Sequence, residues 1–269
     1  MKFFSVALWS SLCWVCVALT GCANSPNSGS QGGSQADIFT ESDEPENRRR
    51  ARLRLELASG YFEQGQINVA LDELKQAIIA DPTFVDAYSL RGLVYMRLND
   101  LPLAEDSFKR ALVINPRDAG VAHNYGWFLC QQARYPESFR MFAQAIANPA
   151  YTSQAKSLMT QGLCQVRAGQ RLEAEQSLTK SYELDAGNPV TGYNLASVLF
   201  DRGELVRSQF YIRRLNNSEL ANAETLWLGV KIEQRLSNTE AVQQLGGQLQ
   251  RRYGQSKEAA SFVKRAFDE

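Results

Sequence analysis

Histidine is almost absent from this chain of 269 residues, and His123 is the single one it contains. No second histidine can therefore serve as a base or a zinc ligand. Cys130 follows seven residues later and would share a helical face with His123, but two turns separate the pair by roughly 10 Å. A nucleophile and its base need a hydrogen bond of about 2.6–3.2 Å. We therefore interpret the stretch from His123 to Tyr135 as packing or groove surface, not as a catalytic site.

Net charge is absent as well, because 29 basic side chains balance 29 acidic ones. A nucleic-acid-binding protein usually carries a basic excess, so no nucleic acid is expected as a partner. The sequence also lacks a phosphate loop, the G-x-S-x-G and H-E-x-x-H motifs, and cysteines at metal-binding spacing. These absences predict a protein that is not an enzyme and that has no cofactor, no metal and no small-molecule substrate.

Long hydrophobic runs are missing except near the start, where FFSVALWSSLCWVCVAL follows Lys2. This run is short for a membrane span, which needs roughly 20 apolar residues, and is typical of a signal peptide over residues 1–21. The run ends at Leu19, and Leu19 to Cys22 resemble a bacterial lipobox, which implies an acylated Cys22. A plain signal peptide with a chance cysteine is the alternative. Ala23 follows, and the sorting pattern of such lipoproteins implies the periplasmic face of the outer membrane.

Residues 22–50 are expected to form a lipidated cysteine followed by a disordered tether. A stretch rich in Gly, Ser, Gln and Asn is followed by DIFTESDEPEN, which has five acidic residues and no basic one. A basic cluster then marks the beginning of the first helix. It is either a solvated helix face or a site for phosphate or lipid headgroups, and its members are Arg48, Arg49, Arg50, Arg52 and Arg54.

From residue 51 the chain repeats itself about every 34 residues, with starts near 51, 85, 119, 155, 189 and 222. Small residues recur at positions 8, 20 and 27, where helices approach closely, and large ones at 4, 7, 11 and 24. In the second repeat these include Gly92, Ala104 and Phe108. The pattern resembles the tetratricopeptide repeat. The resemblance implies an all-α, right-handed superhelical solenoid of six helix–turn–helix repeats over residues 51–269, ending in a capping helix at 256–267.

The turn between the two helices of a repeat should place position 15 at positive φ, which glycine and asparagine tolerate. Four repeats meet this requirement, with Gly65, Asn99, Gly169 and Gly203. Pro102 and Pro136 stand near the start of a second helix, where a missing N–H costs little.

Cys130 and Cys164 lie on the first helices of adjacent repeats, at positions 12 and 10. These helices run nearly parallel, and an oxidising compartment would permit a disulfide that clamps the third repeat to the fourth. Two buried thiols that act as small apolar side chains are an equally good interpretation.

The third and fourth repeats carry a more specific pattern, HNYGWFLCQQARYPESFRMFAQAIANPAY followed by GLCQVRAGQRLEAEQSL. This segment resembles the PilF/PilW lipoproteins of type IV pilus biogenesis. The resemblance implies a pilotin, which carries secretin subunits of the pilus to the outer membrane and promotes their multimerisation. Another envelope lipoprotein of the same architecture is the alternative, either a β-barrel assembly accessory resembling BamD or a peptidoglycan-enzyme scaffold resembling NlpI.

Tetratricopeptide stacks bind polypeptide segments in a concave groove lined by positions 2, 5, 9, 12 and 13 of the first helices. Apolar residues stand there in the first two repeats, and two asparagines at position 6 could hold a peptide backbone. A neighbouring element such as the tether could instead cover the apolar residues, and the asparagines could bond their own neighbours. The candidate groove residues are Leu55, Phe62, Leu93, Met96, His123, Asn124, Trp127 and Asn194.

Overall fold

The computed structural model describes residues 43–267. The expected signal peptide, Cys22 and the tether up to residue 42 lie outside the described residues. Within the described part, thirteen α-helices and no strands are present. They are α1 (Glu46–Glu63), α2 (Ile67–Ala80), α3 (Val85–Arg97), α4 (Leu101–Ile114), α5 (Ala119–Gln131), α6 (Tyr135–Ile146), α7 (Gln154–Arg167), α8 (Arg171–Leu184), α9 (Pro189–Asp201), α10 (Leu205–Asn216), α11 (Ala223–Arg235), α12 (Thr239–Tyr253) and α13 (Lys257–Lys264).

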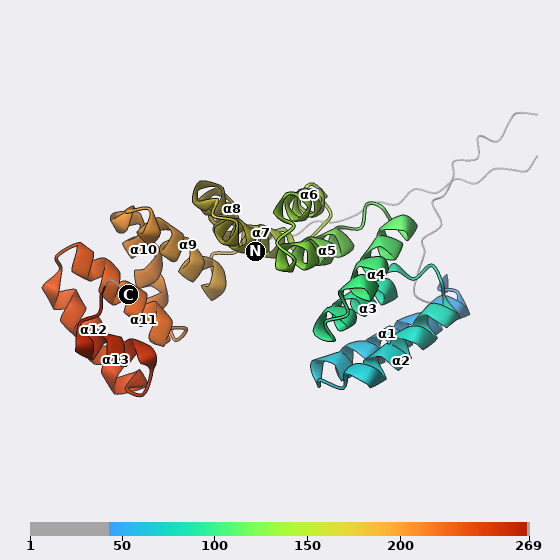
Figure 1. The fold of residues 1–269 in the computed structure, drawn as a ribbon, viewed down its shortest axis with the longest axis horizontal. Coiled ribbons are helices and arrows are strands. Elements are labelled where there is room, and N and C mark those ends of the chain that lie inside the picture. Colours follow the sequence, from blue (N-terminus) through green and yellow to red (C-terminus); the bar gives the residue numbers. More distant parts are fainter. Residues whose placement is uncertain (1–42, 268–269) are drawn as a thin grey trace, which may run out of the picture. The chain divides into compact units, whose positions relative to one another are not determined.

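The helices form six consecutive hairpins, and each helix from α1 to α12 packs on the next along the chain (Figure 1). The first helices of successive repeats also contact one another, from α1 with α3 through to α9 with α11. Among the described helices, no such contact joins the second helices of successive repeats. The first helices therefore lie on the inner side of the stack. The predicted all-α solenoid of tetratricopeptide repeats is confirmed.

Small and large residues at the repeat positions fit together as the pattern predicts. A Cβ atom at Gly92 would lie 2.6 Å from the ring of Phe108, so the pair requires the absence of a side chain at position 8. The same relation joins Gly162 to Leu178 in the fourth repeat. In the first five repeats, the alanines at positions 8, 20 and 27 are fully buried, as Ala104 illustrates. Close helix contact through small residues is therefore the basis of the stack.

The turns inside the repeats contain the predicted residues at positive φ, and two more besides. Gly65, Asn99, Gly169 and Gly203 have φ between 59° and 78°. The third and sixth repeats place Ala133 and Ser237 in the same left-handed region, with φ of 56° and 59°. A Cβ atom is disfavoured there, so the geometry of the hairpin overrides the local preference of these two residues.

Helix α1 begins at Glu46, so residues 46–50 are helical and not part of a disordered tether as the sequence suggested. The reason is charge pairing, because acidic residues precede and follow the basic cluster. Arg49 pairs with Glu46, and Arg52 pairs with Glu44 at 3.1 Å. Arg48 and Arg54 reach Asp81 and Glu73 on or just after α2. Four of the five arginines are thus engaged within the protein.

Candidate partner-binding surfaces

The four apolar residues of the predicted inner groove are half-buried. Leu55 and Phe62 of α1 pack against the core of the first repeat. Leu93 and Met96 of α3 pack against the next core cluster, which includes Phe108. Each of these side chains therefore has one side in the core and leaves the other partly open. They can add apolar area to a groove, but they do not form a continuous exposed patch.

His123 is buried and points into the junction between the third and fourth repeats. Its Nδ1 atom lies 2.8 Å from the Ser157 hydroxyl of α7, and its ring meets Phe142 edge-on. Burial, together with a smaller effect of the nearby Lys156 charge, lowers the pKa of His123 to about 4. The ring is therefore neutral at pH 7, and its contacts are those of a packing residue.

The two asparagines at position 6 bond neighbouring groups of the protein. Asn124 on α5 donates from Nδ2 to the Ser89 hydroxyl on α3, at 3.1 Å. Asn194 on α9 donates to the Val190 carbonyl of its own helix, at 2.8 Å. A bound peptide would have to compete with these bonds.

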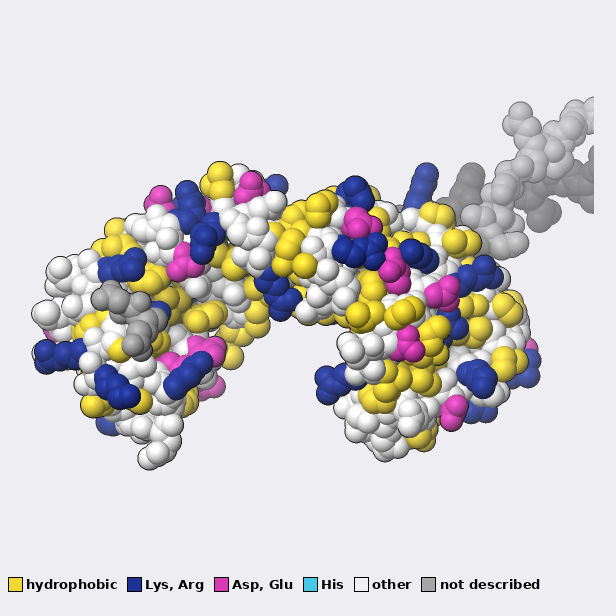
Figure 2. Space-filling model, in the orientation of Figure 1, with side chains coloured by type: hydrophobic (Ala, Val, Ile, Leu, Met, Phe, Trp, Pro, Cys, Tyr) yellow, Lys and Arg dark blue, Asp and Glu magenta, His cyan; other side chains and the backbone are white. Residues whose placement is uncertain are grey.

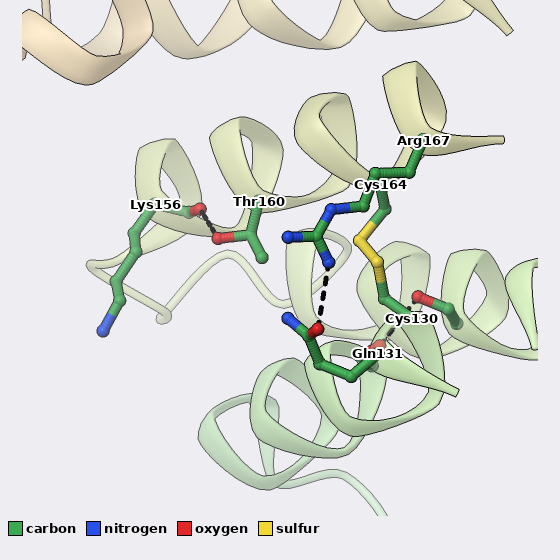
Figure 3. The surroundings of a disulfide bond; sticks show 8 residues. Cys130, Gln131, Lys156, Thr160, Cys164 and Arg167 are labelled. Atoms are coloured by element: carbon green, nitrogen blue, oxygen red, sulfur yellow. Dashed lines mark hydrogen bonds between the residues drawn. A yellow bond between two sulfur atoms is a disulfide. The ribbon is translucent and has the colours of Figure 1, made fainter. Parts of the chain in front are cut away.

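Trp127 lies beside a cross-link between two repeats. Cys130 and Cys164 form a disulfide that joins α5 to α7, with their Cα atoms 6.0 Å apart (Figure 3). The guanidinium of Arg167 stands over the Trp127 ring at 5.2 Å from its centre and donates to the Gln131 side chain at 3.0 Å. This part of the predicted groove is therefore a rigid brace between the third and fourth repeats.

A more exposed apolar surface lies on the first repeat, and Figure 2 shows hydrophobic side chains gathered over the α1–α4 part of the stack. Leu53 and Leu57 of α1 are 50% and 48% exposed, and Ile79 of α2 is 66% exposed. Together with Arg50 and Arg54 they line a hollow of about 590 Å³. We call this surface the end patch. Leu57 holds packing position 7, but within residues 43–267 no repeat precedes it to cover this side chain.

A second hollow, which we call the C-terminal pocket, lies between α9, α11 and α13 and encloses about 370 Å³. Helix α9 contributes Tyr193 and Phe200, and α11 contributes Trp227 and Lys231. Glu258 of α13 closes one side, although that residue is only 7% exposed. The pocket combines aromatic side chains with charged ones of both signs.

No group of three or more potential metal ligands occurs within residues 43–267. In the same range, no helix has both the length and the apolar character needed to cross a bilayer.

Comparison with known proteins shows what the chain as a whole is similar to. The tetratricopeptide repeat family matches residues 55–119. The type IV pilus assembly protein PilF of Pseudomonas aeruginosa is 27% identical over 246 residues, which are 91% of this chain and 94% of that protein. The solved structure of PilF matches with a TM-score of 0.73 at 25% identity, covering 82% of this chain and 100% of that one. The chain is a PilF/PilW-type tetratricopeptide-repeat protein.

The solved structure of PilW, described as a widely conserved type IV pilus biogenesis factor, agrees with this assignment. It matches with a TM-score of 0.71 at 29% identity and covers 79% of this chain and 98% of that one. The coverage extends beyond the 65 residues that match the general repeat family. The resemblance to PilF and PilW therefore includes the arrangement of the repeats as well as the repeat motif.

In this PilF/PilW-type protein, sequence reasoning selected no residue of the C-terminal pocket, and of the end patch it singled out only Arg50 and Arg54 of the basic cluster. The groove rule, when applied to the fifth repeat, places Tyr193, Ser197 and Phe200 at positions 5, 9 and 12, and all three line the pocket. Trp227 holds position 6 of the sixth repeat, the position that drew attention to Asn194. The groove positions in the sequence could therefore have identified these pocket residues, but Asn194 was the only groove candidate chosen from the fifth and sixth repeats.

Proposed function

We propose that this protein is a lipid-anchored pilotin of the outer membrane that binds type IV pilus secretin subunits and promotes their localisation and multimerisation. The observation that carries the proposal is the similarity to PilF, which extends over nearly the whole length of both chains. Homology of this extent supports a role in type IV pilus biogenesis. The protein would act as a binding scaffold, without a catalytic step of its own.

The apolar surface of the first repeat supports the proposal, because a scaffold needs an exposed surface on which a partner can exclude water. The end patch offers three large apolar side chains that share one hollow with two arginines. Apolar anchors surrounded by polar groups are the usual composition of a binding hot spot. We infer that secretin contacts the first repeat at the end patch.

The test produces variants of this protein in a strain that lacks it and measures how far each variant restores pilus function. Leu57→Asp combined with Ile79→Asp should lower the amount of secretin multimers about tenfold or more, because each substitution places a charge in an apolar contact. Multimers are measured by gel electrophoresis of envelope fractions, and twitching motility is scored in parallel. Val113→Asp on α4 is the matched control, since Val113 is 70% exposed and lies outside the end patch.

Normal multimers with the Leu57→Asp and Ile79→Asp pair would contradict the end patch as the docking surface. Loss of multimers only with Leu55→Asp and Phe62→Asp would move the contact into the inner groove. If deletion left secretin multimers intact but depleted outer-membrane porins generally, a β-barrel assembly role would replace the pilotin proposal. Each variant is purified and checked for helical content, so that a folding defect is recognised.

A further inference from the structure

In the C-terminal pocket, cationic side chains of the protein itself lie over the faces of aromatic rings. The ammonium group of Lys231 lies 5.6 Å from the centre of the Phe200 ring and 5.9 Å from that of Trp227. The guanidinium of Arg235 lies 4.2 Å from the Phe200 ring. Trp227 is further held by stacking on Phe267. These rings are thus fixed in place as a preformed aromatic floor.

Carboxylates outnumber ammonium groups around this floor, and Figure 2 shows acidic and basic side chains side by side near α11 and α13. Asp201, Glu224 and Glu258 line the pocket, against Lys231 and Lys257. The two lysines are engaged, Lys231 over the rings and Lys257 with Glu258 at 3.6 Å.

The exposed carboxylates of Asp201 and Glu224 on the pocket rim are held less firmly by salt bridges than the two lysines are held by their contacts. Asp201 meets Arg171 only at 3.9 Å and keeps a side chain that is 47% exposed. Glu224 is exposed in the first turn of α11 and forms no salt bridge within residues 43–267. Among the residues that line the pocket, three carboxylates therefore stand against two ammonium groups.

The pocket carboxylates also affect the pKa of Tyr193, which lies on the wall of the pocket. Burial raises the pKa of its phenol, and the carboxylates of Glu224, Glu258 and Asp201 raise it further. All three of these carboxylates belong to the pocket, and they come from α11, α13 and α9. These three carboxylates near the Tyr193 hydroxyl favour a cation beside the ring.

We propose that the C-terminal pocket binds a polypeptide segment of a partner that presents an arginine or lysine side chain next to an aromatic residue. The cationic group would lie between the Asp201 and Glu224 carboxylates, and the aromatic residue would contact the ring of Tyr193 or Phe200. A volume of about 370 Å³ accommodates side chains of this size. The site is separate from the end patch, and the proposal does not depend on the identity of the partner that binds there.

The test uses a synthetic six-residue peptide, Gly-Ser-Arg-Phe-Ser-Gly, acetylated and amidated at its ends. Its binding to the full chain in detergent micelles is followed by the NMR signal of the Trp227 indole N–H, which a Trp227→Phe variant identifies. The Arg peptide should shift this signal in a saturable way. A peptide with Gln in place of Arg should bind about fivefold more weakly or worse, and one with Glu should not bind.

Two protein variants complete the test. Asp201→Asn combined with Glu224→Gln should weaken binding of the Arg peptide about fivefold or more while leaving the amide spectrum of the folded protein intact. Glu173→Gln is the matched control, because Glu173 is an exposed carboxylate on α8 that does not line the pocket. Three results would overturn the proposal: equal shifts with the Arg, Gln and Glu peptides, undiminished binding by the double variant, or no shift at millimolar peptide.

Discussion

A single buried imidazole joins two repeats of this protein. His123 on α5 contacts Ser157 on α7, and Tyr151 lies 3.4 Å from the same hydroxyl. The ring is buried beside Phe142, and Lys156 stands near it, so a protonated imidazole would lack a compensating anion. The sequence identified His123 as an unusual residue. It could not identify the partner, because Ser157 is 34 positions away and becomes adjacent only when the repeats stack.

The pKa of His123 predicts a loss of stability in mild acid. Its folded-state pKa is about 4, below the ordinary value of 6.5, so the unfolded chain binds a proton first as pH falls. Stability should therefore be constant above pH 6.5 and decline between pH 6.5 and pH 4, by on the order of 2 kcal/mol at pH 5. Urea unfolding at pH 7.5 and pH 5.0 measures the change.

His123→Gln is the control for this prediction, because glutamine keeps a hydrogen-bonding group that does not titrate. Since the chain has no other histidine, the variant should lose most of the difference between the two pH values. An equal difference in the variant would mean that another group causes it.

The helices α5 and α7 are joined covalently, which the sequence left undecided. The disulfide between Cys130 and Cys164 is buried, and Arg167 adds a bond to Gln131 across the same helix pair. The two cysteines are 34 residues apart, so the bond spans one repeat. Sequence position alone could not distinguish a bond from two free thiols, because the outcome depends on the direction of both Cβ atoms.

Removal of this disulfide should destabilise the solenoid. Opening a closed loop of this length should lower the free energy of unfolding by about 2–4 kcal/mol, mainly because the unfolded chain gains conformational freedom. Reductant should therefore lower the urea midpoint of the wild-type protein. In the Cys130→Ala and Cys164→Ala double variant, the midpoint should already be lower and should not respond to reductant. An unchanged midpoint for the reduced wild-type protein would contradict the prediction.

The six repeats form one continuous stack within residues 44–267, and the expected anchor at Cys22 lies outside the described residues. Replacement of Cys22 by alanine should release the protein from the membrane fraction while the solenoid stays folded, because each buried acyl CH₂ contributes about 0.8 kcal/mol to membrane attachment. Fractionation of cell envelopes with antibody detection measures the release. Cys13→Ala is the matched control and should change nothing. Retention of the Cys22→Ala protein in membranes would refute the lipid anchor.

Much of the fold could be predicted from the sequence because the repeat pattern is a local property of each hairpin. Helices α3, α5 and α9 begin at the predicted residues 85, 119 and 189, and α7 and α11 begin within one residue of the predicted starts. Glycine or alanine opposite a large side chain fixes how closely two helices approach, wherever the pair occurs in the chain. The sequence by itself therefore determined the hairpin, its repeat length and the number of repeats.

Only the tertiary structure decided which side chains remain open to a partner. Leu57 and Tyr125 both occupy position 7 of a repeat, yet Leu57 is 48% exposed and Tyr125 is 7% exposed. The difference arises because α1 begins the stack, whereas α5 lies between α3 and α7. The C-terminal pocket likewise depends on α13, which adds Glu258 to residues of α9 and α11. Exposure depends on the neighbours an element has in space, and a position within a repeat does not specify them.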